Sequence, residues 1–326
     1  MAPEYNAATT GSSLVASFPD QIKGKVVLTT GVSPGSLGAT FVETIAAASP
    51  SLLILAGRNS TKTAQTAANI AKAHPDVQIR TLHLDLGSLK AVREAAATVN
   101  SWDDVPALDV LVNNAGIMGV PYALSPEGVE SHFATNHLGH WLFTNLVMGK
   151  ILAAEKPRVV NVASDGHRMS GIRWHDYNFD NGKTYNRWTA YGQSKTANML
   201  MALSLAEKLG RKGLLAFSLH PGVIFTHLAD HLNLETDLAE MQAADRALGN
   251  KEGWKELDFK THDQGVATTV FAAFHPGLEE HNGAYLQDAH VADPWTETVK
   301  PHGTSPVEAE MLWKLSERLV GQEFQY

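Results

Sequence analysis

The sequence predicts a single α/β domain built on a parallel, doubly wound sheet of about seven strands, with helices on both faces. Short, nearly continuous apolar runs recur along the 326 residues, and segments with helical spacing separate them. Strands with that unbroken pattern are typical of parallel sheets covered on both faces. No linker or repeat interrupts the alternation, so we expect one domain over residues 21–326 after a flexible segment at 1–20.

In the first half, residues 25–30 are apolar and lead into a glycine, which predicts a buried strand, and helical spacing follows over 37–48. The apolar run 52–56 predicts a second strand, and a helix over 61–73 is expected to end at His74-Pro75. Residues 77–84 alternate as a third strand, and a helix follows at 89–99. A fourth strand is expected at 108–112.

In the second half, a long helical pattern over 127–154 precedes a fifth strand at 158–163. A helix at 189–209 and a sixth strand at 214–219 follow. A further helix is expected at 263–273, a seventh strand at 284–286 and a closing helix at 306–319. Open sheets of this kind bind ligands at the carboxyl ends of their strands.

Composition excludes several classes of protein. The net charge of −8 argues against a nucleic-acid-binding surface. The absence of cysteine excludes disulfides, thiol nucleophiles and cysteine–zinc sites, and no histidine cluster has metal-ligand spacing. Residues 1–17 lack the basic start and apolar run of a secretory signal, and no apolar stretch is long enough to span a membrane. We therefore expect a cytoplasmic protein without a metal site.

Tyr191 and Lys195 are four residues apart in a predicted helix, so their side chains lie on one face. An ammonium group beside a phenol favours the phenolate, and we expect Lys195 to lower the pKa of Tyr191 from its usual value of about 10. Such a tyrosine can exchange a proton with a carbonyl or alcohol oxygen near neutral pH.

A glycine-rich turn, Thr30-Gly31-Val32-Ser33-Pro34-Gly35-Ser36-Leu37-Gly38, joins the first predicted strand to the first helix. Glycines let backbone amides approach a pyrophosphate, and the helix N-terminus contributes partial positive charge. A position directly after a buried strand is what a Rossmann-type dinucleotide site requires. We expect a nucleotide cofactor at this turn.

The chain resembles the short-chain dehydrogenase/reductase family over most of its length. The family's glycine motif is present at Thr30, Gly31 and Gly35, but its last glycine, Gly38, is one place late and Leu37 occupies the usual position. Five further motifs follow in the family's order: Asp85-Leu86, Asn113-Asn114-Ala115-Gly116, Asn136 in Phe133-Ala134-Thr135-Asn136-His137, Ser164 in Val160-Asn161-Val162-Ala163-Ser164, and Pro221-Gly222-Val223-Ile224-Phe225-Thr226.

The resemblance implies a catalytic set of Asn136, Ser164, Tyr191 and Lys195. Ser164 would hold the substrate oxygen, Tyr191 would protonate it, Lys195 would also bind the nicotinamide ribose, and Asn136 would help position a water in a proton relay. The implied cofactor contacts lie along the strand ends. They are Gly31, Ser33, Gly35, Leu37, Arg58, Asn59, Asp85, Leu86, Asn114, Ala115, Gly116, Val162, Tyr191, Lys195, Pro221, Gly222, Ile224 and Thr226.

Cofactor choice depends on Ala56-Gly57-Arg58-Asn59-Ser60 after the second strand. No acidic residue is present there to bond the ribose 2′-hydroxyl of NAD, whereas Arg58 offers a cation suited to a 2′-phosphate. We expect NADP(H), exchanging hydride with a carbonyl or alcohol.

The motifs Asn136-His137-Leu138-Gly139-His140 and Ser194-Lys195-Thr196-Ala197-Asn198 are similar to those of the retinol-dehydrogenase-like and WW-domain-oxidoreductase-like branch, which mostly handles hydrophobic ketones, aldehydes and alcohols. The region between Ser164 and Tyr191 and the region 225–254 are expected at the active-site edge. Their candidate substrate contacts, forming an apolar wall for a bulky or cyclic small molecule, are His167, Met169, Trp174, Tyr177, Trp188 and Phe225. The alternative is that these side chains only pack loops onto the body; His137 and His140 are expected to be structural.

Two other functions would use the same residues. A dehydratase or epimerase on this fold would use the cofactor in a closed cycle. A non-catalytic NADP-binding redox sensor would bind a protein partner, but such proteins often lose the tyrosine or lysine that this chain retains. A monomer and a homodimer both fit, because family members pair through the helices carrying the asparagine and tyrosine motifs, a surface that residues 291–326 could cover.

Overall fold

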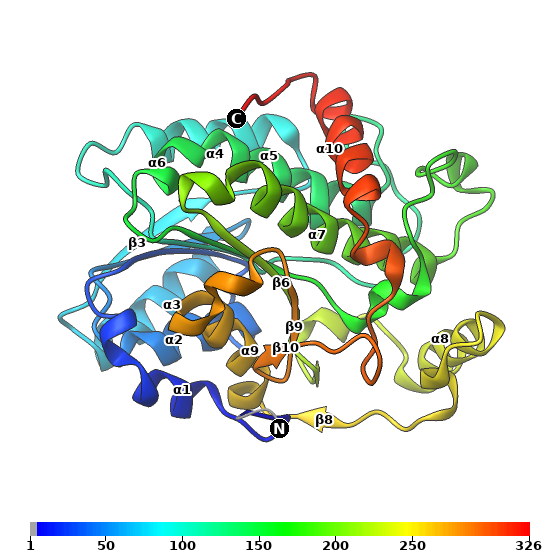
Figure 1. Ribbon diagram of the computed structural model, residues 1–326, viewed down its shortest axis with the longest axis horizontal. Coiled ribbons are helices and arrows are strands. Elements are labelled where there is room, and N and C mark those ends of the chain that lie inside the picture. The colour runs from blue at the N-terminus through cyan, green and yellow to red at the C-terminus, as the bar shows by residue number, and fades with distance from the viewer. Residues whose placement is uncertain (1–4) are drawn as a thin grey trace.

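An eight-stranded sheet forms the centre of the computed structural model, which describes residues 5–326, and helices lie on both of its faces (Figure 1). The strands, in spatial order, are β10 (His290–Val291), β9 (Tyr285–Gln287), β6 (Leu215–His220), β5 (Arg158–Val162), β4 (Val110–Asn113), β1 (Val26–Thr30), β2 (Leu52–Gly57) and β3 (Gln78–His83). All neighbours pair in parallel except β10 with β9. The predicted Rossmann-type fold is confirmed, with one strand more than expected.

The order of the strands reverses between β1 and β4. From β1 the chain proceeds outward through β2 to β3, then returns to β4 on the other side of β1 and proceeds through β5 to β6. The first connections on the two sides of this point lead away from each other, which opens a crevice at the carboxyl ends of β1 and β4. The glycine-rich turn and the Asn113–Gly116 motif both begin there.

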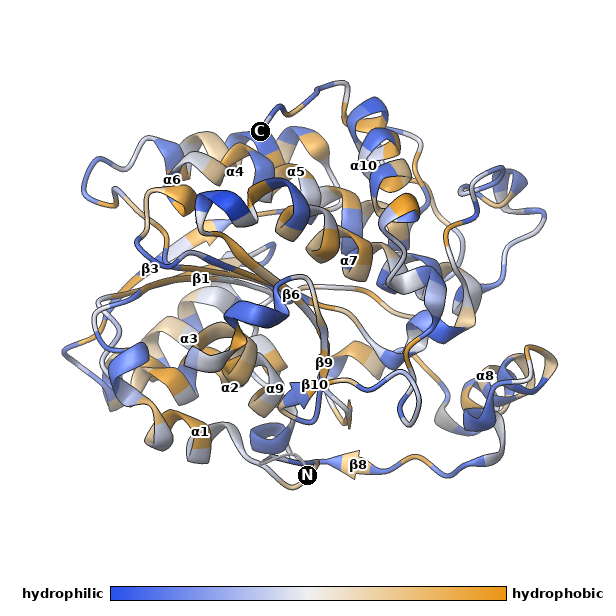
Figure 2. Cartoon of the chain, in the orientation of Figure 1, coloured by the Kyte–Doolittle hydropathy of each residue, from blue (hydrophilic) through white to orange (hydrophobic). Residues whose placement is uncertain are grey.

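Each face of the sheet packs its apolar side chains against one of two layers of helices. On one face lie α4 (Leu89–Asn100), α5 (Gly139–Leu146), α6 (Met148–Leu152), α7 (Arg187–Leu209) and α10 (Pro306–Val320); on the other lie α1 (Gly11–Ser17), α2 (Leu37–Ala46), α3 (Ser60–Ala73) and α9 (His262–Phe274). Successive strand residues point to opposite faces, so Val27 packs with the second layer and Leu28 with the first. Figure 2 shows the hydrophobic residues concentrated in the strands between the layers.

Polar caps define where several helices begin. The side chains of Ser36, Asn59, Ser88 and Ser305 each accept a hydrogen bond from a backbone amide in the first turn of α2, α3, α4 and α10. Such caps satisfy amides that have no partner within the helix. The observed starts therefore agree closely with the predicted ones.

The long helix predicted over 127–154 is wrong in its extent. The helix begins only at Ser131, because the buried Glu130 carboxylate accepts the backbone amides of His132 and Phe133 and ends the preceding loop. It then passes through a π-helical turn, Phe133–Leu138, before α5 and α6. Wide turns of this kind are frequent at functional sites, and this one contains Asn136.

Two segments have more structure than the sequence indicated. Within the segment expected to be flexible, α1 buries Leu14 and Val15 beside α9, and the Ser12 amide donates to Asp263 at 2.9 Å. After β6, the chain forms a small second sheet from β7 (Val223–Ile224) and β8 (Phe259–Lys260), with α8 (Leu234–Ala247) between them. No helix in residues 5–326 has the length and apolar character that crossing a membrane requires.

The C-terminal residues pack onto the helical layer of α5 and α7. Trp313 of α10 meets Trp141 of α5 edge to face, with ring centroids 5.0 Å apart. The Ser204 hydroxyl of α7 donates to the Ala309 carbonyl, and the Tyr326 hydroxyl donates to Asn145. The inner face of α10 is therefore part of the domain core.

We expect Trp313→Ala to lower the free energy of unfolding by about 3–5 kcal/mol, because it leaves a cavity beside Trp141. Met311, on the same helix, is 43% exposed, so Met311→Ala should change stability by no more than about 0.5 kcal/mol. Urea denaturation of both variants measures the difference. Equal stability of the two variants would show that α10 is not part of the core.

Candidate active site

The predicted site residues gather at one edge of the sheet because β1 to β6 are all parallel and each segment follows a strand end. The glycine-rich turn follows β1, Arg58 and Asn59 follow β2, and Asp85 and Leu86 follow β3. Asn114–Gly116 follow β4, Val162 and Ser164 end β5, and Pro221–Thr226 follow β6. Tyr191 and Lys195 reach the same edge from the N-terminal half of α7.

The glycine-rich turn depends on backbone positions that side chains would block. Gly31 and Gly35 have positive φ angles of 75° and 76°. A Cβ on Gly38 would lie 2.5 Å from the Gly31 carbonyl oxygen, so Gly38 allows α2 to approach the end of β1. Gly38 therefore has the packing role expected of the motif's last glycine, despite its displacement by one residue.

The Thr30 hydroxyl joins the glycine-rich turn to the segment after β4. It accepts the backbone amides of Asn114 and Ala115 at 3.0 and 2.9 Å, and the Asn114 side chain donates to the Thr30 carbonyl. The same hydroxyl donates to His140 Nε2 at 2.9 Å. Because Nδ1 of His140 donates to the Asn136 carbonyl, the ring is neutral with its hydrogen on Nδ1.

Both ends of the Asn136 side-chain amide are hydrogen-bonded. Its Oδ1 accepts the Ile117 amide at 2.8 Å, and its Nδ2 donates to the Ile117 carbonyl and to the Ser194 hydroxyl. A Cβ on Gly116 would lie 3.1 Å from Asn136 Oδ1 and 3.6 Å from Lys195 Nζ. The segment after β4 therefore lies directly against both the asparagine and the lysine.

Ser164 and Tyr191 meet because two glycines let α7 approach the turn after β5. A Cβ on Gly166 would lie 2.8 Å from the Tyr191 ring, and one on Gly192 would lie 2.9 Å from the Gly166 carbonyl oxygen. The Ser164 hydroxyl accepts the Gly166 amide at 3.0 Å and donates to Asp165 at 3.3 Å, and it lies close enough to the Tyr191 phenol to lower its pKa. The Ser164 side chain and the Tyr191 ring are therefore neighbours across the turn after β5.

The electrostatics differ from the expectation that Lys195 lowers the pKa of Tyr191. Burial raises the pKa of Tyr191 to about 12, and the hydrogen bond from Ser164 opposes that change. Burial also lowers the pKa of Lys195 to about 8. The Lys195 ammonium donates to the Val162 carbonyl at 2.9 Å and lies 5.6 Å from the centre of the Tyr191 ring. Loss of water around the phenol is the largest influence on its pKa; the charge of Asp165 also raises it, and that of Arg168 lowers it.

The segment after β2 leaves one cation unpaired. Arg58 is exposed and has no hydrogen-bond or ion-pair partner among residues 5–326, and no carboxylate occurs at 57–60. Asn59 is the N-cap of α3, accepting the Lys62 amide at 3.0 Å. Asp85 accepts the Gly87 amide at 3.0 Å, which shapes the turn after β3.

Residues 225–232, which follow β7, lie against two segments of the site. These are the glycine-rich turn and the segment after β4. His227 contacts Gly35, and the carbonyl of Met118 lies 2.8 Å from His231 Nε2. A Cβ on Gly119 would lie 3.1 Å from Leu232 and 3.4 Å from Trp188. Trp188, buried three residues before Tyr191, therefore lies beside the segment after β4.

The other substrate candidates have packing partners. His167 is fully buried and uses both ring nitrogens: Nδ1 donates to the Ser164 carbonyl, and Nε2 accepts the Lys300 amide.

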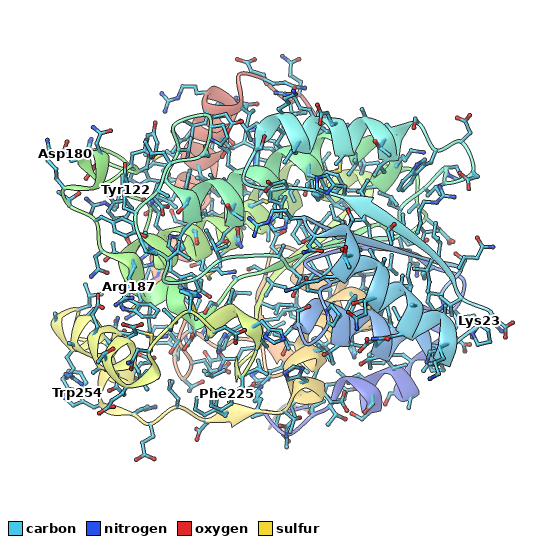
Figure 3. All side chains as sticks on the ribbon, turned by 180° about the vertical axis from the view of Figure 1, so that it is seen from behind. Lys23, Tyr122, Asp180, Arg187, Phe225 and Trp254 are labelled. Atoms are coloured by element: carbon cyan, nitrogen blue, oxygen red, sulfur yellow. The ribbon has the colours of Figure 1, made fainter. Side chains whose placement is uncertain are left out.

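The remaining candidates pack against other parts of the chain. Met169 is buried against Gly192, and Tyr177 packs near Phe133. Trp174 lines a groove with α10, away from Tyr191. Phe225, labelled in Figure 3, is 58% exposed and stacks on Phe259.

Comparisons with known proteins identify the family. A sequence profile described as short chain dehydrogenase matches residues 25–178. Short-chain dehydrogenase/reductase prx1 of Penicillium roqueforti is 37% identical over 311 residues, which cover 92% of this chain and 86% of that protein. The chain belongs to the short-chain dehydrogenase/reductase family.

Further matches define the branch and the fold. Retinol dehydrogenase 12 of Bos taurus is 33% identical and covers 92% of this chain and 88% of its own length, in line with the retinol-dehydrogenase-like branch. An uncharacterized Mycobacterium paratuberculosis protein superposes with a TM-score of 0.68 at 30% identity over 99% of both chains. NADPH-bound carbonyl reductase from chicken fatty liver has the same fold, with a TM-score of 0.58 at 20% identity over 83% of this chain and 99% of that one.

Several residues of the site have no signal in the sequence. Gly166 and Gly192 resemble any other glycines until the structure brings α7 against the turn after β5. Arg168 is buried and makes a bidentate ion pair with Asp245 of α8, at 2.9 and 2.8 Å. Arg168 also pairs with Asp165 at 2.6 Å, but its bidentate partner Asp245 lies 77 residues further along the chain, where the sequence gives no signal for it.

Three buried histidines make stability depend on pH. Burial lowers the pKa of His137 to about 3 and those of His140 and His167 to about 4. In the unfolded chain the pKa is about 6.5, so at lower pH the unfolded state binds protons that the folded state does not. The stability that these neutral, buried histidines allow is fully present above about pH 6.5. The free energy of unfolding then falls as the pH decreases toward 4.

We therefore expect the free energy of unfolding to fall by about 2 kcal/mol per histidine between pH 7 and pH 5. His137→Gln should reduce the total loss by about 2 kcal/mol, whereas His281→Ala, at an exposed position, should leave it unchanged. Urea denaturation at both pH values tests this. The same stability at pH 5 and pH 7 would mean that these histidines are protonated in the fold.

Proposed function

We propose that this protein is an NADP(H)-dependent oxidoreductase that transfers hydride between the nicotinamide and a carbonyl or alcohol group of a hydrophobic, bulky or cyclic substrate. The catalytic residues are Asn136, Ser164, Tyr191 and Lys195. The observation that carries the proposal is the close arrangement of Tyr191 with Ser164, beside the contacts of Gly116 with Asn136 and Lys195. A hydride acceptor in contact with both hydroxyls would lie next to the segment after β4.

The residues present fit a dinucleotide phosphate. The turn has glycines with positive φ at Gly31 and Gly35, and α2 begins directly after it. Arg58 provides a cation without a partner among residues 5–326, and Gly57 provides no competing carboxylate. The chicken carbonyl reductase, which has the same fold, is bound to NADPH, and this supports the same choice.

The cofactor, when bound, supplies the hydride. As negative charge grows on the substrate oxygen, the Ser164 hydroxyl donates a hydrogen bond to it and Tyr191 donates a proton. With a pKa of about 12, Tyr191 is protonated at neutral pH and suited to that donation. Lys195, with a pKa of about 8, is mostly charged at pH 7 and stabilises the phenolate that remains. Asn136 holds the segment after β4 against the lysine.

These protonation states favour carbonyl reduction at neutral pH. Alcohol oxidation needs Tyr191 as a base, and its raised pKa makes the phenolate scarce until the pH is high. The substrate wall would include Trp188 and Leu232, which are apolar and meet at Gly119. A dehydratase, an epimerase or a redox sensor would use the same cofactor site, and net consumption of NADPH with a simple ketone separates a reductase from all three.

We expect Tyr191→Phe to lower turnover at least about a hundredfold, because it removes the proton donor but keeps the ring beside Gly166. NADPH affinity should be nearly unchanged, which fluorescence titration measures alongside steady-state rates. Tyr122→Phe, which removes a hydroxyl that donates to the Asn178 carbonyl, is the matched control and should leave turnover unchanged. Turnover close to that of the wild type in Tyr191→Phe would remove this residue from its assigned role.

We expect the wild type to bind NADP(H) more tightly than NAD(H), and more so at low salt, because Arg58 is exposed and salt screens it. Arg58→Leu should weaken NADP(H) by up to about tenfold and leave NAD(H) unchanged. Arg58→Lys should retain part of the preference. A Cβ on Gly57 would lie 2.8 Å from Thr63 Oγ1, so changes at Arg58 are the cleaner test. Equal weakening of both cofactors would indicate a structural arginine.

A further inference from the structure

The segment after β7 brings one ionisable side chain to the glycine-rich turn. His227 begins a short 3-10 turn, His227–Ala229, for which Thr226 is the N-cap. A Cβ on Gly35 would lie 3.0 Å from His227 Nε2 and 3.3 Å from its Cδ2. The imidazole therefore lies over the positive-φ glycine at the centre of the turn.

Asp230 determines which ring nitrogen faces the turn. Its Oδ2 lies 2.7 Å from His227 Nδ1. A carboxylate only accepts hydrogen bonds, so Nδ1 carries a hydrogen, and Nε2 is the nitrogen left facing Gly35. A protonated ring then has an N–H on the side of the turn and a carboxylate behind it.

Among residues 5–326, the His227 and Asp230 side chains make a hydrogen bond only to each other. The side chains of His227 and Asp230 are 66% and 67% exposed, and the ion pair joins residues of the same short turn. Residues 31–38 contain no ionisable side chain, so His227 brings the ionisable group that the turn lacks. Backbone amides at a helix N-terminus together with an imidazolium form a site suited to an anionic phosphate.

We propose that His227, oriented by Asp230, binds the diphosphate of the dinucleotide; this inference rests on the proposed function. Arg58 follows β2, whereas His227 lies over the turn after β1, so the two cations address different parts of one ligand. NADP(H) and NAD(H) share the diphosphate and differ in the 2′-phosphate. His227 therefore sets the affinity for both cofactors, and Arg58 sets the choice between them.

The test measures the dissociation constants of NADPH, NADH and adenosine 2′-monophosphate by fluorescence or calorimetry. His227→Ala should weaken NADPH and NADH by a similar factor of about three to twenty, and leave adenosine 2′-monophosphate, which has no diphosphate, unchanged. His227→Lys keeps a cation and should restore most of the affinity. Arg58→Leu should show the opposite pattern, with NADPH and adenosine 2′-monophosphate weakened and NADH unchanged. His281→Ala, an exposed histidine elsewhere, is the matched control.

Each outcome bears on a different statement. If the wild type binds both dinucleotides and His227→Ala binds them as tightly, the role of His227 is refuted while the proposed function stands. Two other results would also refute it: weaker binding of adenosine 2′-monophosphate by His227→Ala, or dinucleotide affinity in His227→Lys no higher than in His227→Ala. Either result would mean that the substitution alters the backbone of the turn and does not remove a contact to the diphosphate. If the wild type binds neither dinucleotide, the proposed function fails, and this inference with it.

Discussion

The hydroxyl of Thr30 is the contact on which the candidate site depends. It is buried at the end of β1, accepts two backbone amides from the segment after β4, and donates to His140. His140 in turn holds the carbonyl of Asn136. One side chain therefore positions the glycine-rich turn, the Asn114–Gly116 segment and the π-helical turn relative to one another. Because a hydroxyl donates once and accepts twice, all of its capacity is used.

Close backbone approach makes the second half of the site. Gly166 and Gly192 let α7 pack against the turn after β5, which puts Ser164 and Tyr191 in contact and excludes water from both. The same exclusion raises the pKa of Tyr191 and lowers that of Lys195. Packing and proton chemistry thus have one cause, and the protonated phenol that results suits donation to a carbonyl oxygen.

Helix α8 is joined to both catalytic segments by arginines. Arg168, four residues after Ser164, pairs with Asp245 in a buried contact. Arg187, four residues before Tyr191, donates to Asp237 and Glu240 from a partly exposed position, and Figure 3 shows its label beside α8. A buried pair that loses one partner leaves an uncompensated charge, whereas an exposed pair contributes little. The Asp245 end of α8 is therefore its firm attachment.

The sequence by itself determined the fold class, the strands β1 to β6 and β9, and the motifs that reach the carboxyl edge, because apolar runs and glycine turns are local signals. It did not determine the break in the helix over 127–154, since that depends on Glu130 and on packing around Asn136. It predicted the opposite direction for the pKa of Tyr191, because spacing along a helix says nothing about burial. Contacts between distant segments, such as His227 with Gly35 and Arg168 with Asp245, exist only in the tertiary structure. A sequence pattern reports what lies within a few residues, and these contacts join residues that only the folded sheet brings together.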